Sequence, residues 1–546
     1  MASEVDEVKQ NAVADSVEDS EELFYAAAVQ ILSEDLYPRK LEIIREYIQN
    51  ASDALDDWMK ISDLIPSDRT EPQIKVSIQG KSVLIFDNGI GMTEEDIPKL
   101  KRIAYSEKRV GEEAGYKGIG RLAGIAVAEK LKITSTSYGD PKLYHFEFRA
   151  ADMRKDISDK KKQGVNEQAS PVIKRHTSTW WTDIDPADHY TLVEIRNIKD
   201  SCDELLDSDK LIEYIGDIGP VDFSPEFTHG AVISENLQRR VPDYSPKTIY
   251  LSRPDGKKIK VFKPYNNEMK IAAPQFMDIP DPNNAGELLA YCWYTSNAEE
   301  ILGKMRPTGK IFQVEGDAVE ERRRFAGLVY KLFGFTVGDR SLPERTLWTT
   351  ARARAPWFTG EIHVVDKNVQ PTTPRSDFIE NAARVRFYAE AQKRIPPILK
   401  NLAQEISDNR KAFQDAKNIR QKLDKYKTQL ENAGIERSDL KIIKEELDRS
   451  FRKLNIRKNA TDKEISAYQK DVRRFGETIQ TALSDPKKLK PGYSVSDLVK
   501  ELDMPSKARK VFQIVMDTLQ AHYSKDKDEY DAIAGKIHKA LKDKYV

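Results

Sequence analysis

The sequence predicts an α+β protein that is built from several domains and ends in a long helical region. The chain has 546 residues, more than one hydrophobic core usually organises, so roughly three or four domains are expected. Between residues 201 and 400, short apolar runs typical of strands alternate with helical segments. Beyond residue 400, apolar residues recur at spacings of three and four, which is the coiled-coil pattern.

These patterns divide the chain into segments. We expect an acidic disordered tail at 1–22, a compact domain at 23–200, a second α+β domain at 201–400, a coiled-coil region at 401–485 and a small helical unit at 486–546. No apolar run approaches the roughly 20 residues that a membrane helix needs, and the N-terminus is acidic. A cytoplasmic protein without membrane contact is therefore expected. Cys202 and Cys292 lie far apart and are predicted to be reduced.

The first motif lies on a predicted amphipathic helix that contains REYIQNASDALDDW. Its buried stripe is marked by Leu41, Ile44, Ile48 and Leu55. Glu46, Asn50 and Asp53 fall at i, i+4 and i+7, so they share one face of that helix. A carboxylate and an amide are costly to bury there unless a ligand or ion satisfies them. The pattern predicts a binding site, and an exposed polar stripe is the alternative.

The second motif is the hexapeptide DNGIGM at 87–92, which follows a hairpin predicted from QIKVSIQGKSVLIF. Asp87 is expected at the end of a buried strand, where its carboxylate accepts a hydrogen bond from an exocyclic amine such as that of adenine. Gly89 and Gly91 let the backbone approach a flat ring, and Met92 completes the motif. Asp-Asn-Gly is also common in ordinary turns, but a turn rarely needs all six residues.

The third motif is the glycine-rich segment GYKGIGRLAG at 115–124. Glycines at this spacing before a helix present backbone N–H groups and the helix dipole to phosphates. The phosphate-binding candidates are Gly115, Lys117, Gly118, Ile119 and Gly120. The segment is not a P-loop, because the chain has no Gly-x-x-x-x-Gly-Lys-Ser/Thr. We predict an apolar helix at 125–131 and a mobile lid at 93–114.

In this order and spacing, the three motifs resemble the GHKL superfamily of ATPases, over roughly residues 23–200. REYIQNASDAL, DNGIGM and AGIAVAEK look most similar to the 90-kDa heat-shock chaperones. The resemblance implies a GHKL (Bergerat) α/β-sandwich domain that binds ATP with Mg2+ and hydrolyses it to ADP and phosphate. It makes Glu46 the general base, Asn50 the Mg2+ ligand and Asp87 the reader of adenine, with the glycine segment around the phosphates. Thr191, in YTLVEI, is similar to the threonine that supports the adenine end.

The resemblance extends into the second domain. GFTVGDRSLPERTLWTTARARAPWFTGEIHVVD and PTTPRSDFIENAARVRFYAEA are similar to the middle, or transducer, domain of the same chaperones. There an arginine reaches the γ-phosphate, and Arg375 matches it here. A surface salt bridge is the alternative role for Arg375. Two positions depart from the chaperone pattern, Arg121 in place of an aromatic residue and Tyr105 in place of a lid lysine. Lys108 or Lys117 is a candidate to contact phosphate instead, and an ordinary surface lysine is the alternative for both.

The resemblance implies an ATP-driven conformational switch that closes as a homodimer and acts on protein partners or clients. The C-terminal third does not resemble the dimerisation domain of the well-known chaperones, and hybrids of this kind can belong to bacterial defence systems that work with partner proteins. Sensor histidine kinases are excluded because the first histidine, His145, already lies inside the predicted ATP-binding domain, and topoisomerases because little length remains for a cleavage module.

Two alternatives stay open. The net charge of the chain is −1, yet the residues from 401 onward carry an excess of roughly eight positive charges, which favours a DNA-associated clamp of the MORC or MutL kind. Solvated faces of long helices explain the same charge without DNA. A scaffold that binds ATP without turning it over is the other alternative, and the presence of Glu46 argues against it.

Overall fold

The computed structural model describes residues 11–12, 39–62, 71–101, 120–267, 271–296, 305–308, 311–314, 325–431, 440, 442–446, 448–449, 463–484, 502 and 504–545. The chain divides into two compact units, Met1–Lys400 and Asn401–Val546. This division falls where the sequence predicts the start of the coiled-coil region.

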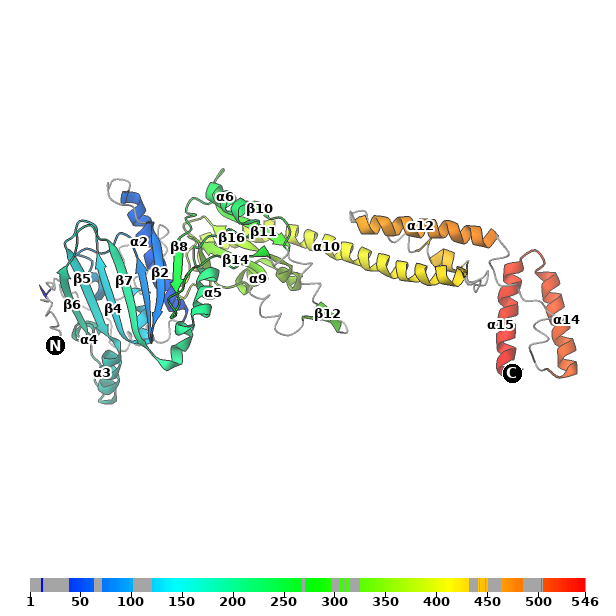
Figure 1. Cartoon of the computed structure of the whole chain (residues 1–546), viewed down its shortest axis with the longest axis horizontal. Coiled ribbons are helices and arrows are strands. Elements are labelled where there is room, and N and C mark those ends of the chain that lie inside the picture. The colour runs from blue at the N-terminus through cyan, green and yellow to red at the C-terminus, as the bar shows by residue number, and fades with distance from the viewer. Residues whose placement is uncertain are drawn as a thin grey trace. The chain divides into compact units, whose positions relative to one another are not determined.

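A nine-stranded sheet organises the N-terminal part of the first unit (Figure 1). Its strand order is β1-β6-β5-β4-β7-β3-β2-β8-β9, and all neighbours are antiparallel except β2 and β8. The strands are β1 (Asn11–Ala12), β2 (Gln73–Gln79), β3 (Ser82–Asp87), β4 (Ala128–Thr136), β5 (Lys142–Arg149), β6 (Thr177–Asp183), β7 (Tyr190–Ile198), β8 (Thr248–Ser252) and β9 (Lys258–Lys260).

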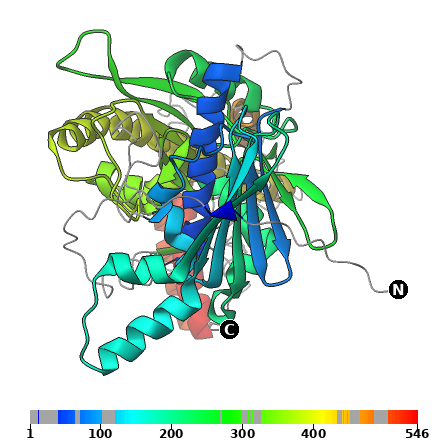
Figure 2. The same ribbon diagram turned by 90° about the vertical axis from the view of Figure 1, so that its left-hand side faces the viewer.

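Helices pack against this sheet, and α2 runs along one of its faces (Figure 2, dark blue). The helical elements are α2 (Glu42–Ser62), η1 (Pro98–Lys101), η2 (Gly120–Ala126), α3 (Ala150–Lys162), α4 (Ala169–His176), η3 (Asp200–Leu206) and α5 (Ser208–Ile218), where η marks a 3-10 helix. Together with the sheet they enclose one hydrophobic core. The α/β-sandwich class expected for this part of the chain is confirmed.

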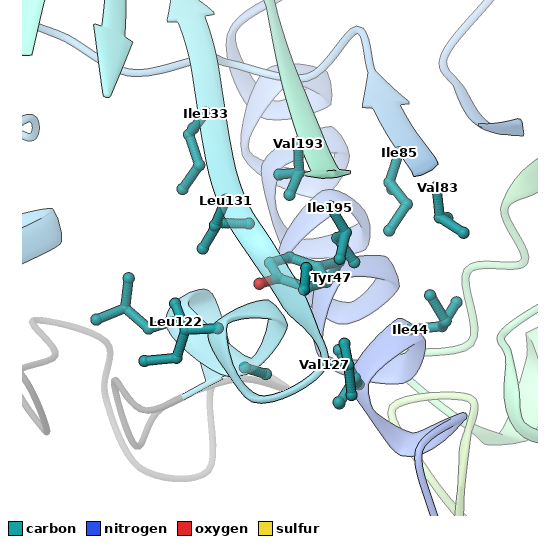
Figure 3. Close-up of a cluster of buried hydrophobic side chains, with 14 of the residues drawn as sticks. Ile44, Tyr47, Val83, Ile85, Leu122, Val127, Leu131, Ile133, Val193 and Ile195 are labelled. Atoms are coloured by element: carbon teal, nitrogen blue, oxygen red, sulfur yellow. The ribbon is translucent and has the colours of Figure 1, made fainter. Parts of the chain in front are cut away.

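The core explains why α2 keeps one polar face. Figure 3 shows apolar side chains from α2, η2 and the sheet meeting in one layer, with Ile44, Tyr47, Val83, Ile85, Leu122, Val127, Leu131, Ile133, Val193 and Ile195 labelled. Ile44 and Ile48 are fully buried, as their helical spacing predicts. The side chains of Glu46 and Asn50 are only partly buried, so they stand at the margin of the core.

The hairpin before the second motif is also as predicted. Val83 and Ile85 on β3 face the core, in alternation with less buried neighbours. Gly80 adopts a φ of 57° in the two-residue turn between β2 and β3, a conformation that glycine accepts readily. Because the register of the hairpin places Asp87 at the last position of β3, its carboxyl group lies at the end of a buried strand.

A five-stranded sheet of order β10-β11-β16-β14-β15 forms the rest of the first unit (Figure 1). All neighbours are antiparallel except β14 and β16. Its strands are β10 (Gln275–Pro280), β11 (Leu288–Ser296), β14 (Gly327–Leu332), β15 (Phe335–Val337) and β16 (Phe358–Val364), and its helical elements are α6 (Gly230–Arg240), α9 (Ser341–Leu347), η5 (Arg352–Trp357) and the beginning of α10 (Ala382–Glu431). A separate pair, β12 (Met305–Thr308) and β13 (Ile311–Val314), completes the strands.

The second unit is helical among its described residues and contains the end of α10, α12 (Lys463–Ser484), α14 (Ser506–His522) and α15 (Lys527–Tyr545). Val472, Phe475 and Ile479, which the sequence assigns to one apolar seam, are all buried on α12. Lys427 of α10 lies over the ring of Phe475, so these two helices pack together. The coiled-coil arrangement and the homodimer remain predictions.

Four expectations need correction. The run at 125–131 is not a helix: η2 ends at Ala126 and β4 begins at Ala128, because a short apolar run also suits a buried strand. One of the short apolar runs that the sequence assigns to strands between residues 201 and 400, AVIS at 231–234, lies inside helix α6. Strands β8 and β9 join the N-terminal sheet although they follow residue 200. The predicted lid is anchored at its start, where Ile97 and Leu100 pack in the core.

The remaining expectations concern the chain ends and the membrane. Within the predicted acidic tail, Asn11 and Ala12 form β1 and pair with the exposed edge of β6, which offers unpaired backbone groups; the rest of the tail lies outside the described residues. No helix in the described part of the chain is both long enough and apolar enough to cross a membrane. Cys202 and Cys292 are buried free thiols.

Candidate active site

Helix α2 supplies the acidic and amide groups of the first motif. Asp53 is buried, whereas Glu46 and Asn50 are partly buried on the same face. The helix forms because its apolar stripe packs on the sheet, and the polar face is then fixed by the 3.6-residue period. The three predicted side chains therefore line one side of α2, as the spacing of the motif required.

Asp87 is a buried carboxyl group at the end of β3. Its side chain is 4% exposed, and its Oδ1 accepts a hydrogen bond of 3.0 Å from the Gly89 backbone N–H. Burial raises the pKa of this carboxyl group from its ordinary 3.8 to about 7, although the Gly89 N–H opposes the rise. A buried acceptor at the end of a strand is suited to hold an amine donor from a ligand.

The glycines of the second motif are required by close packing. A Cβ atom on Gly89 would lie 2.6 Å from the carbonyl carbon of Ala54 on α2. A Cβ atom on Gly91 would lie 1.8 Å from the Thr136 carbonyl oxygen, and Gly91 also has a φ of 71°. The loop is therefore pressed between α2 and β4. Met92, the last residue of the motif, packs partly buried against the core.

Thr191 lies directly opposite Asp87 in the pairing of β3 with β7. Its Oγ1 is 2.9 Å from the Oγ of Ser135 on β4, and Ser135 Oγ also lies 2.8 Å from the Tyr190 carbonyl oxygen. Ser135 carries no signal of its own in the sequence, because its pairing with Thr191 follows only from the register of β4 and β7.

Two aromatic residues that the sequence analysis also missed support the same loop. His189 Nδ1 lies 2.8 Å from the Gly89 carbonyl oxygen, and the His189 ring stacks on Trp58 with centroids 3.7 Å apart. Trp58 belongs to the last turns of α2. The loop at 87–92 is thus held from the helix side and from the strand side.

Gly120 brings the glycine-rich segment next to Glu46. A Cβ atom on Gly120 would lie 2.2 Å from Glu46 Oε2, so only glycine leaves this space to the carboxylate. The following 3-10 helix η2 is tied to α2, since the Gly124 N–H donates to the Tyr47 hydroxyl oxygen at 2.7 Å. Lys199 Nζ donates to the Ala126 carbonyl oxygen at 2.8 Å at the end of η2.

The remaining phosphate-binding candidates cannot be placed. Gly115, Lys117, Gly118 and Ile119, together with Tyr105 and Lys108, lie outside the described residues. Of the five phosphate-binding candidates, the described residues therefore include only Gly120.

Arg375 lies against α2, although it belongs to the loop that follows the second sheet. The Arg375 side chain is 5% exposed, which argues against its alternative role in a surface salt bridge. With the amide oxygen of Gln49 turned toward the guanidinium, Gln49 accepts hydrogen bonds from Arg375 Nε at 3.0 Å and Nη1 at 3.3 Å. Arg45 Nη2 donates to the Pro374 carbonyl oxygen at 3.0 Å. Within two turns, helix α2 therefore carries Glu46 and the two residues, Arg45 and Gln49, that contact the loop of Arg375.

The residues present suit a weakly held divalent cation. Among the described residues, no group of three or more His, Cys, Asp or Glu side chains is placed to hold a metal ion. Mg2+ normally keeps several waters and takes one or two protein ligands together with substrate phosphates. A single amide oxygen from Asn50 fits that mode, and a dedicated protein cage does not.

Comparison with known proteins agrees with this geometry. Residues 41–179 match a protein family described as "Histidine kinase-, DNA gyrase B-, and HSP90-like ATPase". This part of the chain resembles the GHKL ATPases. The matched range, 41–179, is called the GHKL region below. It contains the α2 motif, the 87–92 loop and the glycine-rich segment, and therefore most of the candidate site.

Curated relatives of the GHKL region are chaperone proteins named HtpG. The protein from Borreliella burgdorferi is 32% identical over 121 residues, that from Campylobacter jejuni 30% over 156 residues and that from Rickettsia typhi 31% over 137 residues. These matches cover 19%, 25% and 22% of this chain, and 20%, 26% and 22% of the respective relative. The chain thus matches only about a fifth to a quarter of the length of these relatives.

Proposed function

We propose that the protein binds and hydrolyses ATP and uses the reaction to switch between conformations. The observation that carries the proposal is the environment of α2. Glu46 on this helix lies beside Gly120 of the glycine-rich segment, and its helix neighbours Arg45 and Gln49 contact Pro374 and Arg375. Helix α2 is therefore the element that joins a carboxylate, a phosphate-binding loop and an arginine.

Each residue has a chemical role in this proposal. Asp87 accepts a hydrogen bond from the exocyclic amine of adenine, with Thr191 and Ser135 beside it. Glu46 orients the attacking water and accepts its proton. Arg375 places a guanidinium where negative charge develops on the transferred phosphoryl group. Asn50 would hold Mg2+, which when bound neutralises charge on phosphate oxygens.

The switch follows from the separate origins of these groups. Glu46 belongs to the GHKL region, whereas Arg375 follows the five-stranded sheet in the chain. Hydrolysis therefore depends on the loop at 371–378 staying against α2, and a change in that contact changes the catalytic site. A protein client or partner that prefers one of the two arrangements would be coupled to ATP in this way.

The partners of the chain belong to the same proposal. The similarity to chaperone proteins favours protein clients over the DNA-associated clamp, which we do not propose. The homodimer is proposed from the resemblance to the 90-kDa heat-shock chaperones. A role in a bacterial defence system stays a prediction.

The first experiment is steady-state ATP hydrolysis by the full chain in the presence and absence of Mg2+, with ATP binding measured by calorimetry. Binding and Mg2+-dependent turnover support the proposal, whereas a chain that does not bind ATP overturns it. The mass of the chain in solution, with and without a non-hydrolysable ATP analogue, tests the homodimer, which a monomeric mass under both conditions contradicts.

Replacing Arg375 by alanine is expected to slow ATP hydrolysis about 10- to 1000-fold, because an arginine on a transferring phosphoryl group stabilises the transition state. ATP affinity should change less than kcat, since adenine recognition at Asp87 is retained. Single-turnover hydrolysis and calorimetry measure the two effects. Arg352→Ala, which alters an exposed arginine of the same sheet region, is the matched control and should hydrolyse ATP at the rate of the intact chain.

Gly120→Ala tests the contact between the glycine-rich segment and Glu46. The added methyl group occupies the space of Glu46 Oε2, so the carboxylate must rotate away from its position. We expect kcat to fall by about 10-fold or more, since general-base catalysis needs hydrogen-bond reach to the water. The melting temperature should change little, because the displaced atom is the end of a side chain. Gly476→Ala on α12 controls for the substitution itself, because a Cβ atom added to Gly476 would meet no neighbouring side chain or packed element within 4 Å. Unchanged kcat in Gly120→Ala would contradict this role of the contact.

A further inference from the structure

The loop that carries Arg375 has a rigid backbone. Its ends are joined by a bridge between Pro371 and Phe378. Within the loop, the Arg375 N–H donates to the Thr372 carbonyl oxygen at 3.0 Å, and the Gly338 N–H donates to the Arg375 carbonyl oxygen at 2.7 Å. Arg375 itself adopts a φ of 53°, which is unusual for a residue with a side chain. The backbone at Arg375 is therefore set by its surroundings.

The loop is further tied to its own sheet region through Asp377. The Tyr388 hydroxyl donates to Asp377 Oδ1 at 2.7 Å, and the guanidinium of Arg384 lies 3.7 Å from Asp377 Oδ2. These contacts hold the backbone of the loop, whereas the Arg375 guanidinium itself is held at α2 by Gln49.

At α2, two residues one turn apart contact two consecutive residues of the loop. Arg45 holds the Pro374 carbonyl oxygen, and Gln49 holds the Arg375 guanidinium through Nε and Nη1. Arg45 is 4% exposed, Gln49 1% and Arg375 5%, so both contacts are shielded from water. The amide oxygen is assigned to this side because the opposite orientation would aim the Gln49 NH2 group at guanidinium donors.

The chemistry of the Gln49 side chain matters here. An amide oxygen orients the guanidinium with two hydrogen bonds and, unlike a carboxylate, places no negative charge beside it. A carboxylate at the same position would form an ion pair and compete with an anionic ligand for Arg375. Gln49 is three residues after Glu46 on the helix, so the guanidinium is held within one turn of the proposed general base.

We infer that Gln49 is the positioning residue for Arg375: its buried amide holds the guanidinium at α2, within one turn of Glu46, in an orientation suited to the phosphates of ATP. This inference rests on the proposed ATPase function. The loop at 371–378 is then coupled to helix α2 through the neutral side chain of Gln49, and a change of charge at this one position should alter the coupling.

The test is a double-mutant cycle in the full chain with Gln49→Met and Arg375→Ala. Methionine keeps the length of the side chain but removes the amide oxygen. We expect Gln49→Met to lower kcat about tenfold with KM nearly unchanged, as for loss of hydrogen bonds to a charged group. In the Arg375→Ala background the same change should lower kcat no further. Gln392→Met, which removes the bond from Gln392 to the Thr346 carbonyl oxygen away from α2, is the matched control and should leave kcat unchanged.

Gln49→Glu separates positioning from stability. The new ion pair should preserve the melting temperature, yet it should lower kcat because the guanidinium is retained by the carboxylate. A purely structural role for Gln49 predicts that kcat follows the melting temperature instead. Equal losses of kcat in the intact and Arg375→Ala backgrounds, or no loss in Gln49→Met, would overturn the inference while leaving the ATPase proposal intact.

The remaining outcomes are also decisive. If the chain binds ATP without hydrolysing it, the same double-mutant cycle is measured through the affinity for ATP. A coupling between positions 49 and 375 in the binding free energy then supports the inference, and additive effects of the two substitutions overturn it. Failure of the intact chain to bind ATP overturns both the inference and the proposed function, because the guanidinium then has no phosphate to meet.

Discussion

Glu46→Gln is expected to lower kcat for ATP hydrolysis by about 100- to 10,000-fold, the range that a positioned general base contributes. The amide keeps the size of the side chain and its place beside Gly120, but it cannot accept a proton from water. ATP binding should persist, because Asp87 and the 87–92 loop are untouched. Single-turnover hydrolysis and calorimetry on the same preparation measure the two quantities.

The matched control is Glu42→Gln, one turn earlier on the same helix. It makes the same chemical change to a carboxyl group that lies before the motif, so its kcat should stay near that of the intact chain. Equal losses of kcat in both variants would show that α2 tolerates neither substitution. Retained hydrolysis in Glu46→Gln would exclude Glu46 as the general base.

Asp87→Asn is expected to weaken ATP binding by about 10- to 100-fold, the cost of losing a hydrogen bond to a charged acceptor. The amide also presents two donors where adenine presents one, so part of the site becomes repulsive. Calorimetric titration with ADP measures the loss. Asp200→Asn, on an exposed aspartate that pairs with Lys81, should bind ADP as the intact chain does.

The same variant should change how stability depends on pH. Burial raises the pKa of Asp87 to about 7 in the folded chain, against 3.8 as its ordinary value, so the folded state binds more protons than the unfolded state between these limits. The contribution of Asp87 to stability is therefore greatest below pH 4, falls as the pH rises toward 7 and is about 4 kcal/mol lower above it.

Asparagine does not titrate, so Asp87→Asn should lose this pH dependence. Relative to the intact chain, the variant should gain stability between pH 5 and pH 8, as measured by urea unfolding followed through tryptophan fluorescence. A difference in unfolding free energy that stays constant across this pH range would mean that the Asp87 carboxyl is not protonated in the folded chain at neutral pH.

The parts of the candidate site that depend on a local sequence pattern could be predicted from the sequence. The 3.6-residue period of α2 places Glu46, Asn50 and Asp53 on one face, and the alternation in the hairpin places Asp87 at a strand end. Arg375 was found through its resemblance to a family element, and the structure places it at α2. These are features that a short window of residues can specify.

The parts that sequence reasoning missed depend on contacts between distant residues. The partnership of Gln49 with Arg375 and that of Ser135 with Thr191 exist only after the elements have assembled. The run at 125–131 was assigned to a helix because the strand that contains residues 128–131 forms only when β4 pairs with β5 and β7. No local signal in the chain distinguishes these outcomes.

The parallel pairing of β2 with β8 joins residues 73–77 to residues 248–252. During synthesis the nine-stranded sheet therefore has to wait for a strand that emerges from the ribosome long after the ATP-binding motifs have been made. Until then β2 is an edge strand with unpaired backbone groups, and such an edge is open to pairing with other chains. A fragment cut near residue 200 keeps that edge permanently, so an isolated GHKL region that is meant to stay monomeric needs to extend past β9.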